Sequence, residues 1–255
     1  MGVATVVPVP VGRNNISYVV IDTETDDALL IDALEPTPVL HEAECRGARV
    51  VAHLTTHNHW DHAGGNLLLA SKLPHLEFWS SAYEDTPACT RELHDEEVVQ
   101  FGSLKMTALQ ASSHTRGHLM YLFEQSGPSF LFTGDTVFGG GCGRFFEGSA
   151  LDFQTVLRRF EKMSPCTLLY FGHEYTIKNL GFARVVEPHN KAIITRLEAA
   201  ISTVSEGRLT VPTPLEVEYE TNPFFRAKEP TVMTFARANT ELGVIHNLRE
   251  AKDIF

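Results

Sequence analysis

The sequence predicts an α+β fold, in which two β-sheets pack face to face as an αββα sandwich and a helical domain follows. The first supporting observation is that short β-branched and aliphatic runs occur in two successive batches, each interrupted by segments with helical spacing. The second is that residues 177–206 and 229–252 show helical periodicity. We therefore predict a boundary near residues 174–178, with a β-rich domain over residues 1–175 and a helical domain over residues 176–255.

The first batch of strands begins as a β-meander. Turn-forming Gly-Arg-Asn-Asn and Thr-Glu-Thr-Asp-Asp segments separate three strand-like runs, which cover residues 3–9, 16–21 and 28–31. A helix is predicted to begin at the prolines at positions 36 and 38 and to end by Gly47, before a buried strand over Val50–Thr55. Asn66 is expected to cap a short helix over Leu67–Lys72, which precedes a short strand at residues 77–80.

The second batch of strands is predicted to form two hairpins. Val98–Ser112 makes the first, with Phe101–Ser103 at its turn. Tyr121–Phe123 and Phe130–Phe132 make the second around a Gln-Ser-Gly-Pro turn. The β-rich domain is further predicted to contain a helix at residues 152–163 and a strand at residues 167–171. Among the later helices, only residues 217–219 have the pattern of a strand.

A dense group of potential metal ligands follows the buried strand directly. Six consecutive residues contain three histidines and one aspartate, in the order His57-Asn58-His59-Trp60-Asp61-His62. In an extended segment His57 and His59 point the same way, because side chains alternate with period two. The turn toward the next two glycines can direct Asp61 and His62 to a neighbouring position. This density of nitrogen and oxygen ligands favours a site for two adjacent metal ions over a polar loop with surface histidines.

Charge and composition narrow the classes of partner. The chain has 255 residues, a formal net charge of -11, 43% hydrophobic residues and 21% charged residues, which is typical of a globular protein. The negative charge argues against a nucleic-acid partner, because phosphates would be repelled. A local basic cluster can still attract a small anion. No apolar stretch reaches the ~20 residues of a membrane span, and the first residues lack the pattern of a signal peptide.

Three further candidate ligands follow predicted strands, namely His114, Asp135 and His173. Glycine immediately precedes Asp135 and His173, and the absence of a Cβ atom lets backbone approach an ion closely. Taken singly these residues carry little weight, since a histidine after a strand is more often a loop or core residue and Gly-Asp is a common turn. In combination with the dense cluster they indicate one larger site.

Together these residues resemble the metallo-β-lactamase superfamily, and more narrowly the glyoxalase II family of hydroxyacylglutathione hydrolases. The resemblance implies a metallo-β-lactamase sandwich as the catalytic domain and a C-terminal helical domain that binds the substrate. Matching blocks run through nearly the whole chain in the family's order, at residues 56–66, 113–118, 132–136, 141–148, 172–176, 222–226 and 248–253.

The resemblance also implies which side chains hold each metal ion. One ion is bound by His57, His59 and His114. The second ion is bound by the remaining ligands, which are Asp61, His62 and His173, and Asp135 bridges both ions. Asp61 and Asp135 are then the catalytic carboxylates. Asn58 stands where many members have a third consecutive histidine, and that histidine is not a ligand in the family.

The set of donor atoms predicts the kind of metal and the chemistry. Five imidazoles and two carboxylates without a thiolate suit two divalent ions, with Zn²⁺ expected and Fe or Mn as the alternatives. Two ions about 3.5–4 Å apart can hold a bridging hydroxide at neutral pH, which attacks a carbonyl that one ion polarises. A thiolate leaving group needs little protonation, so that no separate general acid is required.

A glutathione thioester is anionic, so an acidic chain needs a local basic patch to bind it. Arg249 and Lys252 are spaced i, i+3 and share one helix face, which by itself also fits a solvated surface. The resemblance implies that they bind the glycine carboxylate of glutathione, and that Arg144 and Tyr175 also contact the substrate. Phe146 stands where the family commonly has tyrosine, and Arg144 where lysine is common. We therefore predict weaker glutathione binding than in a typical member, with the chemistry unaffected.

The sequence thus predicts a monomeric thioester hydrolase for S-(2-hydroxyacyl)glutathione, which converts S-D-lactoylglutathione to D-lactate and glutathione in methylglyoxal detoxification. Its partner is this small molecule, with no nucleic acid and no membrane. Four scattered cysteines without CxxC pairing indicate reduced thiols in the cytoplasm, with the mitochondrial matrix as the alternative. The rival function is a mononuclear-iron glutathione persulfide dioxygenase of the same superfamily, which would lack the helical region with Arg249 and Lys252.

Overall fold

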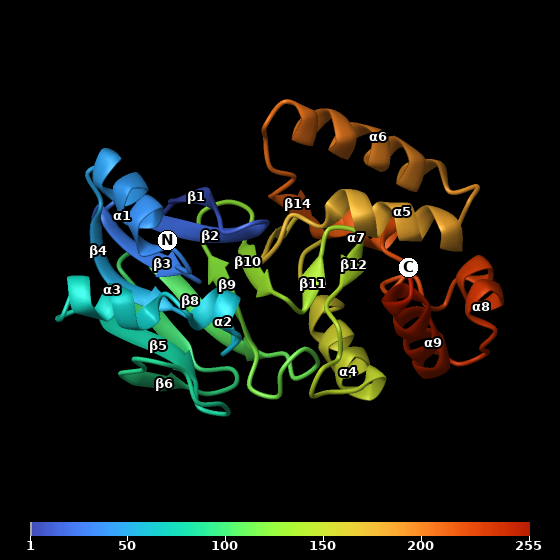
Figure 1. Ribbon diagram of the computed structural model, residues 1–255, viewed down its shortest axis with the longest axis horizontal. Helices are drawn as coiled ribbons and strands as arrows, with labels where there is room; N and C mark the ends of the chain where they lie inside the picture. Colours follow the sequence, from blue (N-terminus) through green and yellow to red (C-terminus); the bar gives the residue numbers. More distant parts are fainter. Residues whose placement is uncertain (1) are drawn as a thin grey trace.

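The computed structural model describes residues 2–255, which form two facing β-sheets with helices outside them and further helices beyond (Figure 1). The α+β sandwich predicted from the sequence is therefore confirmed. Each large sheet has six strands, and a short two-stranded hairpin stands beside them. Within residues 2–255, no helix combines the length and the apolarity needed to cross a lipid bilayer.

The strands of the first sheet lie side by side in the order in which they occur in the chain. β1, β2 and β3 are antiparallel neighbours, as the predicted meander requires, whereas β3, β4, β5 and β6 run parallel. Parallel neighbours bring their C-terminal ends to the same edge of the sheet. The strands are β1 Ala4–Val11, β2 Asn15–Asp22, β3 Asp27–Ile31, β4 Arg49–Leu54, β5 Glu77–Ser81 and β6 Arg91–Leu93.

Two helices connect the parallel strands of the first sheet and cover its outer face. α1, Pro36–Cys45, links β3 to β4, and α3, Asn66–Lys72, links β4 to β5 (Figure 1). Alternation along β2 divides its side chains between two cores: Val19 and Ile21 pack with these helices, whereas Tyr18 and Val20 pack toward the second sheet.

The second sheet has the strand order β14-β13-β10-β9-β8-β7. Both predicted hairpins are confirmed, because β7 pairs antiparallel with β8 and β9 with β10. β13 runs parallel to β10 after helix α4, whose start is fixed by a capping box between Ser149 and Asp152. These elements and the separate hairpin are β7 Val98–Phe101, β8 Leu104–Gln110, β9 Leu119–Glu124, β10 Phe130–Gly134, β11 Val137–Phe138, β12 Gly141–Cys142, α4 Ala150–Phe160 and β13 Leu168–Phe171.

The core between the sheets is rich in aromatic side chains. The ring of Tyr18 on β2 lies 5.0 Å from that of Phe132 on β10, and the Tyr18 hydroxyl donates to the carbonyl of Phe171 at 2.5 Å. Leu54 and Phe171, the last residues of β4 and β13, are fully or almost fully buried in this core. The candidate metal ligands therefore begin where the apolar core ends.

Five helices follow β13 within the described residues, and in Figure 1 α5, α6 and α7 are drawn above α4, with α8 and α9 to its right. The apolar faces of α5, α7, α8 and α9 join α4 and the outer face of the second sheet in one core, which includes Phe153, Phe182, Phe224 and Leu248, whereas α6 packs on α5 and α7. Between α6 and α7 the short strand β14 pairs antiparallel with β13, so that the later part of the chain also contributes to the second sheet. The elements are α5 Thr176–Val186, α6 Lys191–Ser205, β14 Thr213–Pro214, α7 Leu215–Thr221, α8 Pro230–Ala236 and α9 Glu241–Asp253.

Two local predictions are wrong. Val217–Tyr219 lies within helix α7, because Leu215, Glu218 and Thr221 recur at helical spacing and are all buried. Asn66 does not cap α3 with its side chain but is the first residue of that helix. Its buried amide instead donates to Thr55 Oγ1 and to the carbonyl of Pro87, both at 3.0 Å.

Candidate metal centre

The seven candidate ligands come from four loops that meet at one end of the sandwich. β4 leads into the dense cluster, whose last part is the one-turn helix α2, Trp60–Ala63. The other loops follow β8, β10 and β13, and they carry His114, Asp135 and His173. Most of these ligand side chains are buried, which indicates a preformed site at the end of the core.

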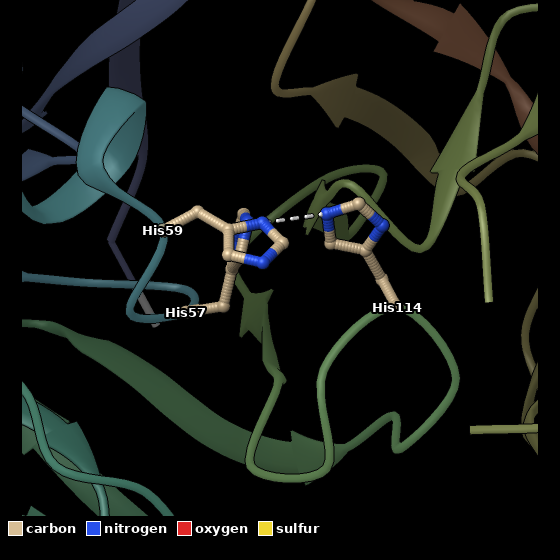
Figure 2. A group of neighbouring side chains, drawn as sticks. All are labelled: His57, His59 and His114. Carbon is tan, nitrogen blue, oxygen red and sulfur yellow. Dashed lines mark hydrogen bonds between the residues drawn. The ribbon is translucent and has the colours of Figure 1, made fainter. Parts of the chain in front are cut away.

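Three imidazoles form what we call the first cluster: His57, His59 and His114. Their ligand atoms all lie within 4.8 Å of one another. His59 Nδ1 is 3.1 Å from His57 Nε2 and 3.0 Å from His114 Nε2. Figure 2 shows the two histidines of the β4 loop and His114 of the opposite loop converging on a common point.

The second cluster consists of Asp61, His62 and His173, whose ligand atoms also lie within 4.8 Å of one another. His173 Nε2 is 3.2 Å from His62 Nε2 and 3.4 Å from Asp61 Oδ2. Asp135 stands between the two clusters. Its Oδ1 is 3.2 Å from His62 Nε2, and its Oδ2 is 3.4 Å from His114 Nε2 and 3.3 Å from His173 Nε2.

Two observations indicate that these residues fit divalent cations. Ring nitrogens face one another at 3.0–3.2 Å within both clusters, and neutral imidazoles so placed present lone pairs to a shared space. Asp135 Oδ1 is buried and accepts no hydrogen bond of good geometry among residues 2–255, although His62 Nε2 lies 3.2 Å away. A buried carboxylate oxygen without a hydrogen bond costs free energy. A cation between the facing nitrogens would be bound by their lone pairs and would also neutralise this carboxylate.

The protein also holds the far side of four ligand rings. Each of these imidazoles directs its other nitrogen to an oxygen at 2.9–3.2 Å, in the pairs His57 with Thr56 Oγ1, His62 with Asp32 Oδ2, His114 with the Arg144 carbonyl, and His173 with Asn14 Oδ1. Such outer partners orient metal-binding rings and raise their basicity. They leave Nε2 of these four rings directed inward, whereas His59 presents Nδ1.

The electrostatics of the site set the protonation states of its candidate ligands in different ways. Burial lowers the pKa of His57 well below its ordinary value, so that this imidazole is neutral. Burial opposes ionisation of Asp135, yet His62 and His173 outweigh it and hold the pKa of Asp135 well below its ordinary value. Burial likewise opposes protonation of His62, but Asp135 and Asp32 raise the pKa of His62 well above its ordinary value. Cation binding therefore displaces a proton from this cluster.

Glycines before two ligands allow the close approach expected from the sequence. A Cβ atom on Gly172 would lie 2.5 Å from Asp135 Oδ1 and 2.7 Å from His62 Cε1. Gly134 has a φ angle of +48°, and a Cβ atom there would lie 2.5 Å from His118 Nε2. His118 Nε2 accepts a hydrogen bond from the Asp135 backbone N–H at 3.1 Å, so that this close approach helps to fix the position of Asp135.

A cavity of about 680 Å³ opens beside the two clusters. Apolar side chains at its mouth include Trp60, which is 76% exposed, and Phe146, which is 61% exposed. The Phe146 ring lies edge-on to His59 and His114, with centroids 5.6 and 5.2 Å away. Tyr175 lines the cavity too and stacks on His173 at 4.7 Å.

Cationic side chains line the cavity, namely Arg144 from the loop after β12 and Lys178, Arg249 and Lys252 from the C-terminal helices. Arg249 is only 7% exposed, so it is not part of a solvated helix face. Its Nη1 donates to the carbonyls of Cys142 and Gly143 at 2.8 and 3.3 Å. These bonds tie helix α9 to the loop after β12.

The other cations of the cavity differ in how they are partnered. Asp253 Oδ1 lies 3.0 Å from Arg249 Nη2 and 3.1 Å from Arg144 Nε, so that one carboxylate serves both guanidinium groups. Lys252 Nζ donates to Asn179 Oδ1 at 2.6 Å, and burial followed by the charge of Arg249 lowers the pKa of Lys252 to about 8. Lys178 is exposed and forms no ion pair within residues 2–255.

The sequence motifs missed several residues that support the site. Asp32 directly follows β3, the strand beside β4, and a carboxylate in that position after a buried parallel strand was a usable signal. Asn15 donates to the carbonyl and to Oδ2 of Asp61 at 2.9 and 3.3 Å, but it is the first residue of β2 and lies far from the motifs in the chain. The signal for Lys178 was its position about one helical turn after Tyr175, at the start of α5, which brings its side chain to the same cavity.

Comparison with known proteins agrees with this geometry. Residues 11–173 match the metallo-beta-lactamase superfamily, and residues 174–255 match the hydroxyacylglutathione hydrolase C-terminus. A cytoplasmic hydroxyacylglutathione hydrolase from Arabidopsis thaliana is 36% identical over 250 residues, which cover 96% of this chain and 96% of that protein.

Solved structures share the fold at lower sequence identity. A metallo-beta-lactamase from Staphylococcus aureus has a TM-score of 0.69 at 19% identity, over 96% of this chain and 66% of that one. ETHE1 from Myxococcus xanthus also has a TM-score of 0.69, at 20% identity, over 97% of this chain and 91% of that one.

The sandwich and its ligand-bearing loops place the chain in the metallo-β-lactamase superfamily. The near full-length relative and the matching C-terminal region narrow this assignment. The chain belongs to the hydroxyacylglutathione hydrolases, the glyoxalase II family.

Proposed function

We propose that this chain hydrolyses S-(2-hydroxyacyl)glutathione thioesters at a binuclear metal centre, with S-D-lactoylglutathione giving D-lactate and glutathione. The observation that carries the proposal is the placement of two ligand clusters, joined by Asp135, beside a cavity lined with cations. The family relationship supports the same reaction.

The side chains divide into groups that hold the metals and groups that hold the substrate. The residues of the two clusters would hold divalent ions, which would supply Lewis acidity and lower the pKa of a bound water toward neutrality. Asp61 and Asp135 are the carboxylates of this centre, and Asp135 fixes the two clusters relative to each other. The leaving group is a thiolate whose conjugate acid has a pKa of roughly 8.5, which explains why the cavity needs no dedicated proton donor.

We propose Zn²⁺ as the resident metal, with Fe or Mn as the alternatives. The donor set of five imidazoles and two carboxylates favours these borderline and hard ions over soft ones. Cys142 lines the same cavity, but burial raises the pKa of its thiol to about 11. A protonated thiol is a poor metal ligand, so Cys142 stays outside the ligand set.

The cationic cavity suits an anionic substrate despite the overall charge of -11. Arg144, Arg249, Lys252 and Tyr175 surround it, and we propose that they bind the glutathione part. The Arg249 guanidinium and the Lys252 ammonium then face the glycine carboxylate. We propose that this hydrolysis belongs to methylglyoxal detoxification and takes place in the cytoplasm, with the mitochondrial matrix as the alternative. We also propose that the protein is a monomer without nucleic-acid or membrane partners.

Metal analysis combined with a thioester assay tests this function. We expect about two divalent ions per chain, as for binuclear hydrolases, and hydrolysis of S-D-lactoylglutathione that a chelator abolishes and added metal restores. The rival reaction is tested on the same preparation by oxygen consumption with glutathione persulfide. One bound iron, oxygen uptake and no hydrolysis would reject the proposal in favour of a persulfide dioxygenase.

Phe146→Tyr is expected to lower KM for the glutathione thioester about 2- to 10-fold, since a neutral hydrogen bond contributes about 0.5–1.5 kcal/mol. Phe146 is 61% exposed and lines the cavity, so a hydroxyl added to its ring meets solvent or substrate and not the core. Initial-rate kinetics give KM and kcat, and kcat is expected to stay constant. Phe146→Leu is the control without a hydroxyl. An unchanged or higher KM in Phe146→Tyr would show that no donor is missing at this position.

A further inference from the structure

The first cluster is assembled from loops of two different sheets. His57 and His59 follow β4 of the first sheet, whereas His114 lies between β8 and β9 of the second. The distance from His59 to His114 therefore depends on what joins these loops. One such link is backbone: Leu119 N–H donates to the carbonyl of Thr56 at 2.8 Å.

Glu84 provides a second link between the same loops. It lies in the loop after β5 and is half-buried. Its Oε1 accepts the backbone N–H of Asn58 at 2.7 Å, and its Oε2 accepts the backbone N–H of Gly117 at 3.2 Å. Asn58 stands between the two ligands His57 and His59 in the chain.

The position of this carboxylate follows the register of the two segments. Thr56 and Leu119 are joined by a backbone hydrogen bond. Asn58 lies two residues after Thr56, and Gly117 lies two residues before Leu119. Both of these residues direct an N–H group to Glu84, and one carboxylate satisfies both. The side chain thus continues the link at a point where the backbones no longer bond to each other directly.

Packing holds Glu84 in this position. A Cβ atom on Gly117 would lie 2.4 Å from Glu84 Cγ and 2.6 Å from Glu84 Cβ. The absence of a side chain at residue 117 is therefore what admits the Glu84 stem between the loops. The second cluster has different supports, because Asn15 contacts Asp61 and Asp32 contacts His62.

We propose that Glu84 is a positioning residue for the first metal site, which sets the separation of His59 from His114 by holding Asn58 and Gly117. The inference rests on the proposed function only in taking the first cluster as a metal site. Glu84 should affect the first cluster and not the second. Within residues 2–255, its carboxylate forms no hydrogen bond with Asp61, His62 or His173.

The test is a Zn²⁺ titration of the metal-free, full-length protein against a competing chelator. Loss of an outer-shell partner lowers metal affinity about 10- to 100-fold, so Glu84→Ala is expected to weaken one of two Zn²⁺ sites by that factor. Glu147→Ala is the matched control, because Glu147 is exposed and its carboxylate accepts one N–H within residues 2–255, that of Arg116 in the same loop. Unchanged Zn²⁺ affinity in Glu84→Ala overturns the proposal.

Two backgrounds assign the weakened site. With His173→Ala, which disables the second cluster, Glu84→Ala is expected to weaken the remaining Zn²⁺ site. With His114→Ala, which disables the first cluster, Glu84→Ala is expected to change nothing further. Equal losses in both backgrounds would overturn the selective role and indicate a general effect on the fold.

Glu84→Gln keeps the test decisive if the alanine variant fails to fold. Its amide oxygen can accept from Asn58, but its NH₂ group then faces the Gly117 N–H, so an intermediate loss of Zn²⁺ affinity is expected. Circular dichroism and thermal unfolding report whether each variant is folded. Wild-type affinity in a folded Glu84→Gln overturns the proposal. The titration uses no substrate, so Glu84-dependent Zn²⁺ binding without thioester hydrolysis would reject only the proposed function.

Discussion

Asp135→Asn is expected to lose metal from both sites and to lower kcat by orders of magnitude. The two carboxylate oxygens of Asp135 approach His62 on one side and His114 and His173 on the other, within 3.2–3.4 Å. Asparagine offers one neutral oxygen, and its NH₂ group would direct hydrogens into the space that a cation needs. The change therefore removes a negative charge and replaces one of the two acceptor oxygens with a hydrogen-bond donor.

Metal content by elemental analysis and kcat by initial rates measure this effect on the same sample. Asp27→Asn is the control of equal size, because Asp27 forms an ion pair with Arg49, whose side chain is 76% exposed. An ion pair with so exposed a partner contributes about 1 kcal/mol or less, and Asp27 lies outside both ligand clusters, so metal content and kcat should remain those of the wild type. Near-normal metal content in Asp135→Asn would refute the bridging role.

Arg249→Ala is expected to raise KM for the glutathione thioester about 10- to 100-fold, since a hydrogen bond to a charged group contributes about 1.5–3 kcal/mol. The same substitution is expected to destabilise the protein, because Arg249 is buried and holds the carbonyls of Cys142 and Gly143. Leaving those carbonyls without a donor costs about 1–3 kcal/mol. Steady-state kinetics and thermal unfolding record the two effects separately.

Lys178→Ala separates the electrostatic part of this effect from the structural part. Lys178 lines the same cavity but forms no ion pair within residues 2–255, so its loss removes a charge without disturbing the loop after β12. A smaller rise in KM and an unchanged melting temperature are expected. A small thioester without the tripeptide completes the comparison, since an equal effect of Arg249→Ala on that substrate would show that Arg249 is not a substrate anchor.

Much of the fold could be predicted because its signals are local. The hairpin turn at residues 101–103 and the cluster of candidate ligands after β4 are short patterns, in which neighbouring residues suffice to predict the local structure. Val217–Tyr219 misled because two β-formers at alternate positions outweighed the helical spacing of Leu215, Glu218 and Thr221, whose burial comes only from the tertiary structure.

The supports of the metal centre could not be predicted in the same way. Asp32 contacts His62 across 30 positions of the chain, and Glu84 contacts Gly117 across 33. Carboxylates of this kind look like any acidic surface residue until the loops are placed together. Asn66 shows the same limit, because its amide bonds to Thr55 and Pro87 and not to the first turn of its own helix.

Strand β14 has a consequence for the independence of the two parts of the chain. It lies at the edge of the second sheet and covers Leu168 and Leu169 of β13, and Leu215 N–H adds a bond to the Thr167 carbonyl at 2.9 Å. A chain truncated after residue 175 would leave β13 as an uncovered, apolar edge, which is a template for pairing with another molecule. The C-terminal residues thus also protect the catalytic sandwich against self-association, and shortened forms should be examined for aggregation before their activity is interpreted.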